Sequence, residues 1–196
     1  MGEHFQQSTY FQYYNQLLTN QRLNEAAQTY GYRIAFFPHP NLQPYENLFS
    51  YGKSVDVVPA YASYQELYRK GSLLVTDYSS VVFDFAYMYK PVLYTQFDKE
   101  EFFHGEHVFT KGYFDYERDG FGEVEYDLDG TVNRIIEYMA NGCQMKEKYR
   151  QRVAHFFAYH DRSSCQRVYE KILQVMGEKS THAFTGRKNQ RKDSSC

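Results

Sequence analysis

The segment Thr76-Asp77-Tyr78-Ser79-Ser80 has residue types and a position that suit the binding of an anion. It follows the apolar run 73–75, typical of a buried parallel strand, and apolar residues at helical spacing follow it as far as Tyr89. Ser79 or Ser80 is the natural N-cap of that helix, and the backbone N–H groups just beyond a cap lack partners. Together with the helix dipole these groups favour a bound phosphate. Capping alone explains the same residues about as well, so the local pattern leaves both interpretations open.

Alternating helices and strands are predicted on both sides of this segment. Before it, the pattern indicates one or two helices within 10–30 with a break at 19–20, followed by a strand over 33–38. The prolines of 38–44 predict an irregular loop. A strand over 54–58 and a helix over 63–69 come next. After it, Lys90-Pro91 ends the helix and a strand begins at Val92. A long Gly- and aromatic-rich loop is expected over 102–126, followed by helices starting near 129, 145 and 163.

Repeated strand–helix units with short connections predict an α/β fold, a Rossmann-like parallel sheet with helices on both faces. Ligands of such sheets bind beyond the carboxyl ends of the strands. The loops that begin at Pro38, Pro59, Thr76 and Thr95 all open at that edge. We therefore expect the binding site there.

The composition limits the number of domains and the class of partner. The 196 residues suffice for one sizeable core, so we expect one domain over 1–177. Residues 178–196 are basic and polar with almost no apolar side chains, which predicts a disordered tail. A formal net charge of −2 supplies no global field that would attract nucleic acid or a membrane. Partners must therefore be inferred from local sites.

Cysteine usage and hydropathy indicate the cellular compartment. The 3 cysteines are odd in number and lack C-x-x-C spacing, which argues against a disulfide framework and a structural zinc site and favours a reducing cytosol. The sequence contains no apolar run of about 20 residues, the length of a membrane-spanning helix, and its start lacks the features of a signal peptide. We expect a cytoplasmic protein.

Two histidine patterns could also carry chemistry. His39 lies between two prolines directly after a predicted strand, where an imidazole could meet a ligand, although a lone histidine is more often structural. His104 and His107 are three residues apart in a glycine-containing loop without a clear third ligand, so we expect no metal site. The sequence also lacks the G-x-x-x-x-G-K pattern of a nucleotide triphosphatase loop.

Several motifs resemble the CDP-glycerol glycerophosphotransferase family of teichoic-acid and capsule polymerases. The similarity runs from about Tyr10 to Leu173, and the combination of 76–80 with Phe83-Asp84 is its most specific part. The segments that match in order and spacing are Pro38-His39-Pro40, 76–84, 90–92, the Asp98 segment, 112–115 and 120–122. The end of the chain departs from the family pattern, since only Asp161, Arg167 and Val168 remain of a longer motif.

The resemblance implies a GT-B architecture, two Rossmann-like halves facing a cleft, of which this chain is similar to the C-terminal, donor-binding half. The implied reaction moves glycerol phosphate from CDP-glycerol to a teichoic-acid or capsular polymer and releases CMP. The acceptor, a polyanionic polymer or lipid-linked chain, would be held by an N-terminal half without a counterpart here. The chain is then a truncated piece or one part of a split enzyme, weakly active alone. It would act as a peripheral protein at the inner face of a bacterial membrane.

The resemblance also implies roles for individual residues. Thr76, Ser79 and Ser80 would hold the donor diphosphate, and His39 would donate to a phosphate oxygen or protonate the leaving group. Asp77 suits a turn anchor better than a catalyst, because a carboxylate beside a diphosphate is repulsive unless it is protonated or bridged by a cation. The supporting candidates are Asp84 near the helix start, Pro59 in a loop that could take the cytosine, Asp98, Lys111, Arg118 and Arg167.

Two other functions remain open from the sequence. The same fold could use another donor, CDP-ribitol or a nucleotide sugar. It could also be a noncatalytic interaction module whose basic tail docks to a membrane or a partner. No cofactor is implied beyond the donor itself, and a need for a divalent cation stays open.

Overall fold

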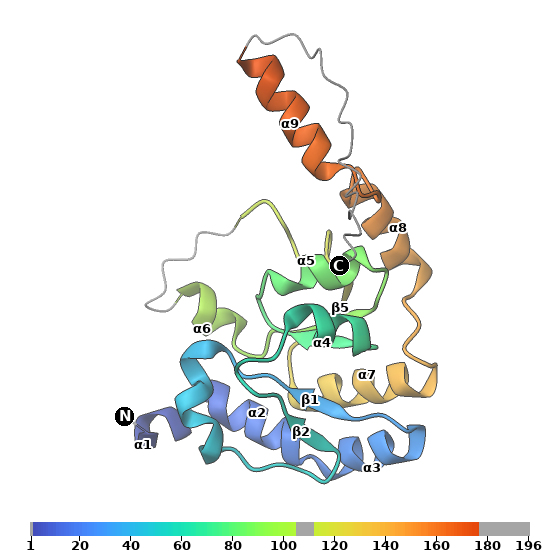
Figure 1. The fold of residues 1–196 in the computed structure, drawn as a ribbon. Coiled ribbons are helices and arrows are strands. Elements are labelled where there is room, and N and C mark those ends of the chain that lie inside the picture. The colour runs from blue at the N-terminus through green and yellow to red at the C-terminus, as the bar shows by residue number, and fades with distance from the viewer. Residues whose placement is uncertain (1, 105–111, 177–196) are drawn as a thin grey trace, which may run out of the picture. The chain divides into compact units, whose positions relative to one another are not determined.

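The computed structural model of the chain describes residues 2–104 and 112–176 (Figure 1). The chain separates into a first compact unit that ends at Ala158 and a second that begins at Tyr159. The expected tail 178–196 lies outside the described residues, so the expected division near 177 stays a prediction.

The described strands are all paired in parallel. β1 (Ile34–Phe36) pairs with β2 (Val55–Val57), and β4 (Val92–Thr95) lies between β3 (Leu74–Thr76) and β5 (Gly122–Glu125). Thr76 lies opposite Tyr94 in the register of β3 and β4, so these two strands end at the same edge. The α/β fold with a parallel sheet, predicted from the alternation of helices and strands, is confirmed.

The helices surround these strands (Figure 1). In the first unit they are α1 (Gly2–Gln6), α2 (Thr9–Thr19), α3 (Gln21–Tyr30), α4 (Tyr64–Lys70), α5 (Val81–Tyr87), α6 (Lys99–His104), α7 (Leu128–Ala140) and α8 (Glu147–Phe156). The predicted break between α2 and α3 is confirmed at Asn20, whose side chain accepts a hydrogen bond from Leu23 N at 3.0 Å. Gly31 ends α3 at a φ of 73°, a left-handed conformation that glycine adopts without strain.

The sheet is covered on both faces, and β4 shows this most directly. Val92 and Tyr94 pack into a cluster with α5 and α8, whereas Leu93 packs into a second cluster with α3 and α7. Because successive side chains of a strand point to opposite faces, these clusters lie on the two sides of the sheet. All three β4 residues have an exposed fraction of 0%. The two-faced burial explains why this strand reads as a continuous apolar run.

The predicted irregular loop over 38–44 is wrong, because a 3-10 helix, η1 (Pro40–Leu48), occupies most of it. Pro40 stands at the start of η1, where a missing N–H costs nothing. Leu42 N donates to His39 O at 2.7 Å and closes the first turn. The fixed φ of proline lies within the range of 3-10 geometry, so prolines excluded an α-helix here but not a tighter one.

The predicted loop over 102–126 is also wrong in part, since it contains β5. Gly122 is required there, because a Cβ on it would lie 1.7 Å from the Val92 carbonyl oxygen of the neighbouring strand. The strand was missed because Glu123 and Glu125 give it no apolar alternation.

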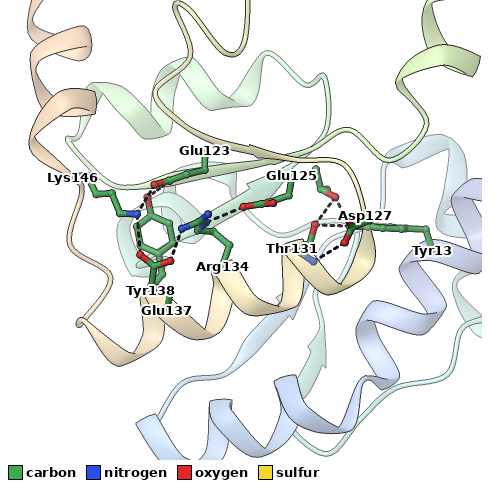
Figure 2. Close-up of polar contacts among 11 residues, drawn as sticks. Tyr13, Glu123, Glu125, Asp127, Thr131, Arg134, Glu137, Tyr138 and Lys146 are labelled. Carbon is green, nitrogen blue, oxygen red and sulfur yellow. Dashed lines mark hydrogen bonds and ion pairs between the residues drawn. The ribbon is translucent and has the colours of Figure 1, made fainter.

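Those two carboxylates are paired with groups of α7 and of the turn that follows it (Figure 2). Glu123 accepts from the Tyr138 hydroxyl at 2.5 Å and forms an ion pair with Lys146 at 2.7 Å. Glu125 accepts from Arg134 Nε at 2.9 Å. Glu137 also pairs with both Arg134 and Lys146. We call these six residues the β5–α7 network, and in it charged groups take the place of an apolar contact.

The second unit contains α9 (Ser164–Val175). Arg167 stacks over the Tyr159 ring at 3.8 Å and donates to both carboxylate oxygens of Asp161 at 2.9 and 3.0 Å.

Among the described residues, none of the helices is long and apolar enough to cross a membrane.

Candidate functional site

Two cavities open at the carboxyl ends of the strands, where the sequence predicts a site. The larger one, of about 630 Å³, is lined by His39, Val58, Thr76, Asp77 and Ser79 together with apolar side chains. We call it the histidine cavity. Its lining comes from the ends of β1, β2 and β3, as the topology of a parallel sheet requires.

The smaller cavity, of about 280 Å³, lies on the other side of Ser79. It is lined by Ser79, Ser80, Gln96 and Lys99 and by aromatic rings that include Phe83 and Phe114. We call it the glutamine cavity. Ser79 lines both cavities, so the turn between β3 and α5 forms part of the wall that they share.

The two serines of this turn do not cap α5 through their side chains. Ser80 precedes α5 as predicted for an N-cap, but its φ of −67° and ψ of −11° are already helical, and its hydroxyl makes no capping hydrogen bond. Neither serine hydroxyl has a hydrogen-bond partner within residues 2–104 and 112–176. Capping, one of the two interpretations left open by the sequence, therefore does not account for both hydroxyls.

Thr76 and Asp77 connect β3 to this turn. Thr76 is the buried last residue of β3. Asp77 accepts a hydrogen bond from Tyr78 N at 2.7 Å, which stabilises the turn locally. This contact agrees with the expectation that Asp77 anchors the turn.

Asp98 lies close to the same turn. The Tyr78 hydroxyl donates to its carboxylate at 3.2 Å. Burial raises the pKa of Asp98 above its usual value, and the negative charge of Asp77 raises it further. Burial and the same two carboxylates raise the pKa of Tyr10, which lines the histidine cavity. The electrostatics of this corner therefore disfavour further negative charge unless a proton or a cation offsets it.

His39 lies at the rim of the histidine cavity and is exposed. It caps η1, and its Nδ1 accepts a hydrogen bond from Asn41 N at 3.3 Å. A neutral imidazole that accepts at Nδ1 carries its proton on Nε2. The capping contact thus selects the tautomer that can donate from Nε2 to a ligand.

The supporting candidates of the sequence do not gather at one place. Asp84 is exposed in the first turn of α5, where its charge suits the helix dipole. Pro59 lies just beyond β2 and, unlike Val58, does not line the histidine cavity. Lys111 lies outside the described residues, and Arg167 belongs to the second unit.

Arg118 is engaged in its own loop. It donates to both carboxylate oxygens of Asp119 at 2.6 and 2.8 Å and to Tyr113 O at 2.8 Å. The hydrogen bond from Arg118 is the largest cause that lowers the pKa of Asp119, to about 2. The guanidinium lines neither cavity, so its contacts are those of a residue that shapes the loop.

Lys90 has a structural role that sequence analysis missed. Its Nζ donates to three backbone carbonyls at the end of α4, those of Tyr68, Arg69 and Gly71, at 2.6 to 2.9 Å. These carbonyls have no partner within the helix, so the ammonium group satisfies them. Burial lowers the pKa of Lys90.

Gln96 was also missed. It follows β4 directly and is 2% exposed. Its backbone N–H donates to Glu125 O at 2.8 Å, but its side-chain Nε2 has no partner among the described residues. The preceding Thr95 is fixed by buried contacts to the hydroxyls of Tyr13 and Thr131. For Gln96, the position at the carboxyl end of a strand was the only signal available from the sequence.

Within the described ranges, we find no group of three or more His, Cys, Asp or Glu side chains that could hold a metal ion. His107 of the histidine pair considered above lies outside those ranges.

Comparisons with known proteins identify relatives of this chain. The chain is 41% identical over 175 residues to the minor teichoic acid biosynthesis protein GgaB of Bacillus subtilis (strain 168), covering 89% of this chain and 19% of that protein. It is 37% identical over 95 residues to the teichoic acid poly(glycerol phosphate) polymerase of the same organism, covering 48% of this chain and 12% of that protein. The chain thus spans about a fifth or less of the length of these relatives.

A solved structure supports the fold. The wall teichoic acid polymerase TagF matches with a TM-score of 0.55 and 21% identity, over 82% of this chain and 38% of that one. This confirms the predicted Rossmann-like α/β architecture of the GT-B type. The sequence profile described as CDP-glycerol:poly(glycerophosphate) glycerophosphotransferase matches residues 4–174. The chain belongs to this family of transferases.

Proposed function

We propose that this chain is the donor-binding domain of a glycerophosphotransferase that moves glycerol phosphate from CDP-glycerol to a teichoic-acid or capsular polymer and releases CMP. The observation that carries the proposal is the pair of serines, Ser79 and Ser80, whose hydroxyls have no partner among the described residues. Ser79 lines both cavities and Ser80 lines the glutamine cavity. Hydroxyl groups donate to acceptor oxygens, and a diphosphate presents such oxygens. The family of the chain supports a nucleotide diphosphate as the ligand.

The reaction has a simple outline. An acceptor hydroxyl attacks the phosphorus that carries glycerol, the bond from that phosphorus to the oxygen of CMP breaks, and CMP leaves with the negative charge. Catalysis needs positioning, a proton acceptor and stabilisation of the charge on the leaving phosphate. Ser79, Ser80 and Thr76 supply the positioning. The proton acceptor belongs to an N-terminal half that also holds the polymer or its lipid-linked precursor.

His39 supplies stabilisation of the leaving group. Nε2–H is the donor that the ring has available for a ligand, because Nδ1 accepts a hydrogen bond from Asn41 N. Donation from neutral imidazole to an oxygen of the CMP phosphate offsets the developing charge without adding a proton to the ring. Asp77 holds the turn rather than the substrate. A divalent cation would offset the charge of Asp77 and Asp98 beside the diphosphate.

Titration calorimetry of the 196-residue chain tests the proposal. We expect CDP and CMP to bind and UDP and ADP to bind at least tenfold more weakly. His39→Ala should reduce CDP affinity several-fold, because one donor to the phosphate is lost. His155→Ala, an exposed histidine of α8, is the matched control and should bind as the wild type does. Failure of every cytidine nucleotide to bind would refute the proposal.

A panel of CDP-glycerol, CDP-ribitol and nucleotide sugars, assayed with the whole enzyme in bacterial membranes, tests the related alternative of another donor. The membrane preparation also tests whether the enzyme acts as a peripheral protein at the inner face. Unchanged CDP affinity in the His39 variant and in a double serine variant would instead favour a noncatalytic module.

A further inference from the structure

The glutamine cavity contains a buried donor that the fold does not use. Gln96 is 2% exposed, and its Nε2 has no hydrogen-bond partner among the described residues. Buried amide groups are nearly always paired, because leaving one unpaired costs free energy. Gln96 lines the glutamine cavity, so a ligand there is the natural partner for the amide.

Hydrogen bonds of the backbone and of the preceding residue fix the position of Gln96 in the fold. Gln96 N donates to Glu125 O at 2.8 Å and Lys99 N donates to Gln96 O at 3.3 Å. The Thr95 hydroxyl contacts the Tyr13 and Thr131 hydroxyls in the core. These contacts fix the backbone of Gln96 at the end of β4, so its side chain starts from a fixed point beside the cavity that it lines.

The remaining lining indicates the chemistry of the ligand. Lys99 contributes one positive charge and Asp115 and Glu117 contribute two negative charges. Lys99 and Glu117 both contact the Tyr126 hydroxyl. Phe83 and Phe114 contribute apolar ring faces. A ligand with alcohol groups fits this mixture, because each hydroxyl can accept from an amide or ammonium and donate to a carboxylate. The carbon chain of a short polyol can pack against the rings.

The position of the cavity relative to the serines agrees with a polyol. Ser79 lines both cavities and Ser80 lines only the glutamine cavity. A diphosphate at these serines would extend the nucleoside to one side and the esterified alcohol to the other. The nucleoside is the larger part and the histidine cavity is the larger space, at about 630 Å³ against about 280 Å³. The smaller space is left for the alcohol.

We propose that the glutamine cavity binds the glycerol unit of a glycerol phosphate, with Gln96 Nε2 donating to one of its hydroxyl oxygens as a specificity-determining contact. This inference rests on the proposed function. The unit can come from the donor or from the end of the growing polymer, since both present the same glycerol phosphate chemistry.

Two ligands of equal charge test the donor as the source. The first is CDP-glycerol and the second is the n-propyl ester of CDP, which keeps the three-carbon chain without its hydroxyls. We expect the wild-type chain to bind CDP-glycerol about tenfold more tightly, because a site built to bond a hydroxyl rejects the analogue that lacks it. In Gln96→Met the preference should fall below about twofold, with the affinity for CDP unchanged. Gln28→Met, at an exposed position of α3, is the matched control.

Glycerol 3-phosphate added to the chain saturated with CMP tests the polymer end as the source. If glycerol 3-phosphate binds the wild type and does not bind Gln96→Met, the cavity is assigned to the glycerol unit at the end of the polymer. If Gln96→Met does not fold, as judged by circular dichroism, Gln96→Glu keeps the shape of the side chain and removes the donor at neutral pH.

Three results would overturn the inference. One is a wild-type chain that binds CDP but neither prefers CDP-glycerol to the propyl ester nor binds glycerol 3-phosphate. Another is that Gln96→Met and Gln96→Glu both fold and both retain the preference for CDP-glycerol or the binding of glycerol 3-phosphate. The third is a folded Gln96→Met variant that loses as much affinity for CDP as for CDP-glycerol, because the amide would then not act on the glycerol unit. Failure of CDP to bind the wild type contradicts the proposed function instead.

Discussion

Polar side chains serve opposite purposes in two regions of this molecule. In the β5–α7 network, Glu123, Glu125, Arg134 and Glu137 are each paired by hydrogen bonds or ion pairs at 2.5 to 2.9 Å. At the carboxyl edge of the strands, the hydroxyls of Ser79 and Ser80 and the amide of Gln96 have no partner among the described residues. The first region uses its polar groups to hold the fold together, and the second leaves them available for the ligand proposed above.

The two regions differ in how the pairing of their polar groups affects the free energy of folding. Removing a charge from water costs free energy unless it is paired, and the largely buried Glu123 and Glu125 of the network both have partners. A donor left unpaired costs the fold free energy, which binding of a ligand can recover. We therefore expect substitutions at the edge to weaken binding with little loss of stability, and substitutions in the network to do the reverse.

The largest effect is expected for Ser79→Ala with Ser80→Ala. Removing two hydrogen bonds to a charged diphosphate, each worth about 1.5 kcal/mol, should weaken CDP binding roughly a hundredfold. The free energy of unfolding should change by less than about 0.5 kcal/mol, since neither hydroxyl caps α5. Calorimetry and urea unfolding measure both quantities. Ser72→Ala, an exposed serine before β3, is the control. A loss of stability above about 1 kcal/mol would show that the hydroxyls serve the fold.

Tyr138→Phe is expected to have the next largest effect, on stability alone. The Tyr138 ring is 1% exposed, and its hydroxyl donates to Glu123 at 2.5 Å. Losing a hydrogen bond to a half-buried carboxylate should reduce the free energy of unfolding by about 2 kcal/mol. The affinity for CDP should stay within twofold of the wild type. Tyr30→Phe, at a residue that is 45% exposed, is the control. Weaker CDP binding in the Tyr138 variant would contradict a separation of the two regions.

The smallest effect is expected for Asp98→Asn, and it should depend on pH. Burial raises the pKa of Asp98 above 3.8, so the folded state holds this proton more tightly than the unfolded state does. The contribution of Asp98 to stability is therefore present at low pH and is lost as the pH rises through the raised pKa. Asn keeps the acceptor for the Tyr78 hydroxyl without the charge.

Urea unfolding of this variant and the wild type at pH 3 and pH 7 measures the effect. The variant should be more stable at pH 7, by less than about 1 kcal/mol, and similar at pH 3. If Asp98→Asn raised the free energy of unfolding equally at pH 3 and pH 7, the charge of Asp98 would not be the cause of the change in stability.

In the β5–α7 network the pH dependence of stability has the opposite sign, because hydrogen bonding to Lys146 is the largest cause that lowers the pKa of Glu137 below 4.5. Its contribution is present above pH 4.5 and is lost as the pH falls through the lowered pKa.

Local patterns predicted most of the fold but not its polar contacts. The break at Asn20, the end at Gly31 and the turn at 76–80 each depend on neighbours a few residues away. β5 was missed, because its glutamates are buried by partners on α7 and beyond it, far along the chain. η1 was missed because proline signals the absence of an α-helix and says little about a 3-10 turn.

The candidate site divides in the same way. The sequence by itself determined the residues of the serine turn, the place of His39 after a strand, and the edge where both must lie, since hydrophobic periodicity and parallel topology are local in origin. Only the tertiary structure decided that the serines do not cap α5 and that Arg118 is engaged in its own loop. It also decided that Gln96 faces the turn across a cavity, because the pairing of β3 with β4 and of β4 with β5 places distant strand ends side by side.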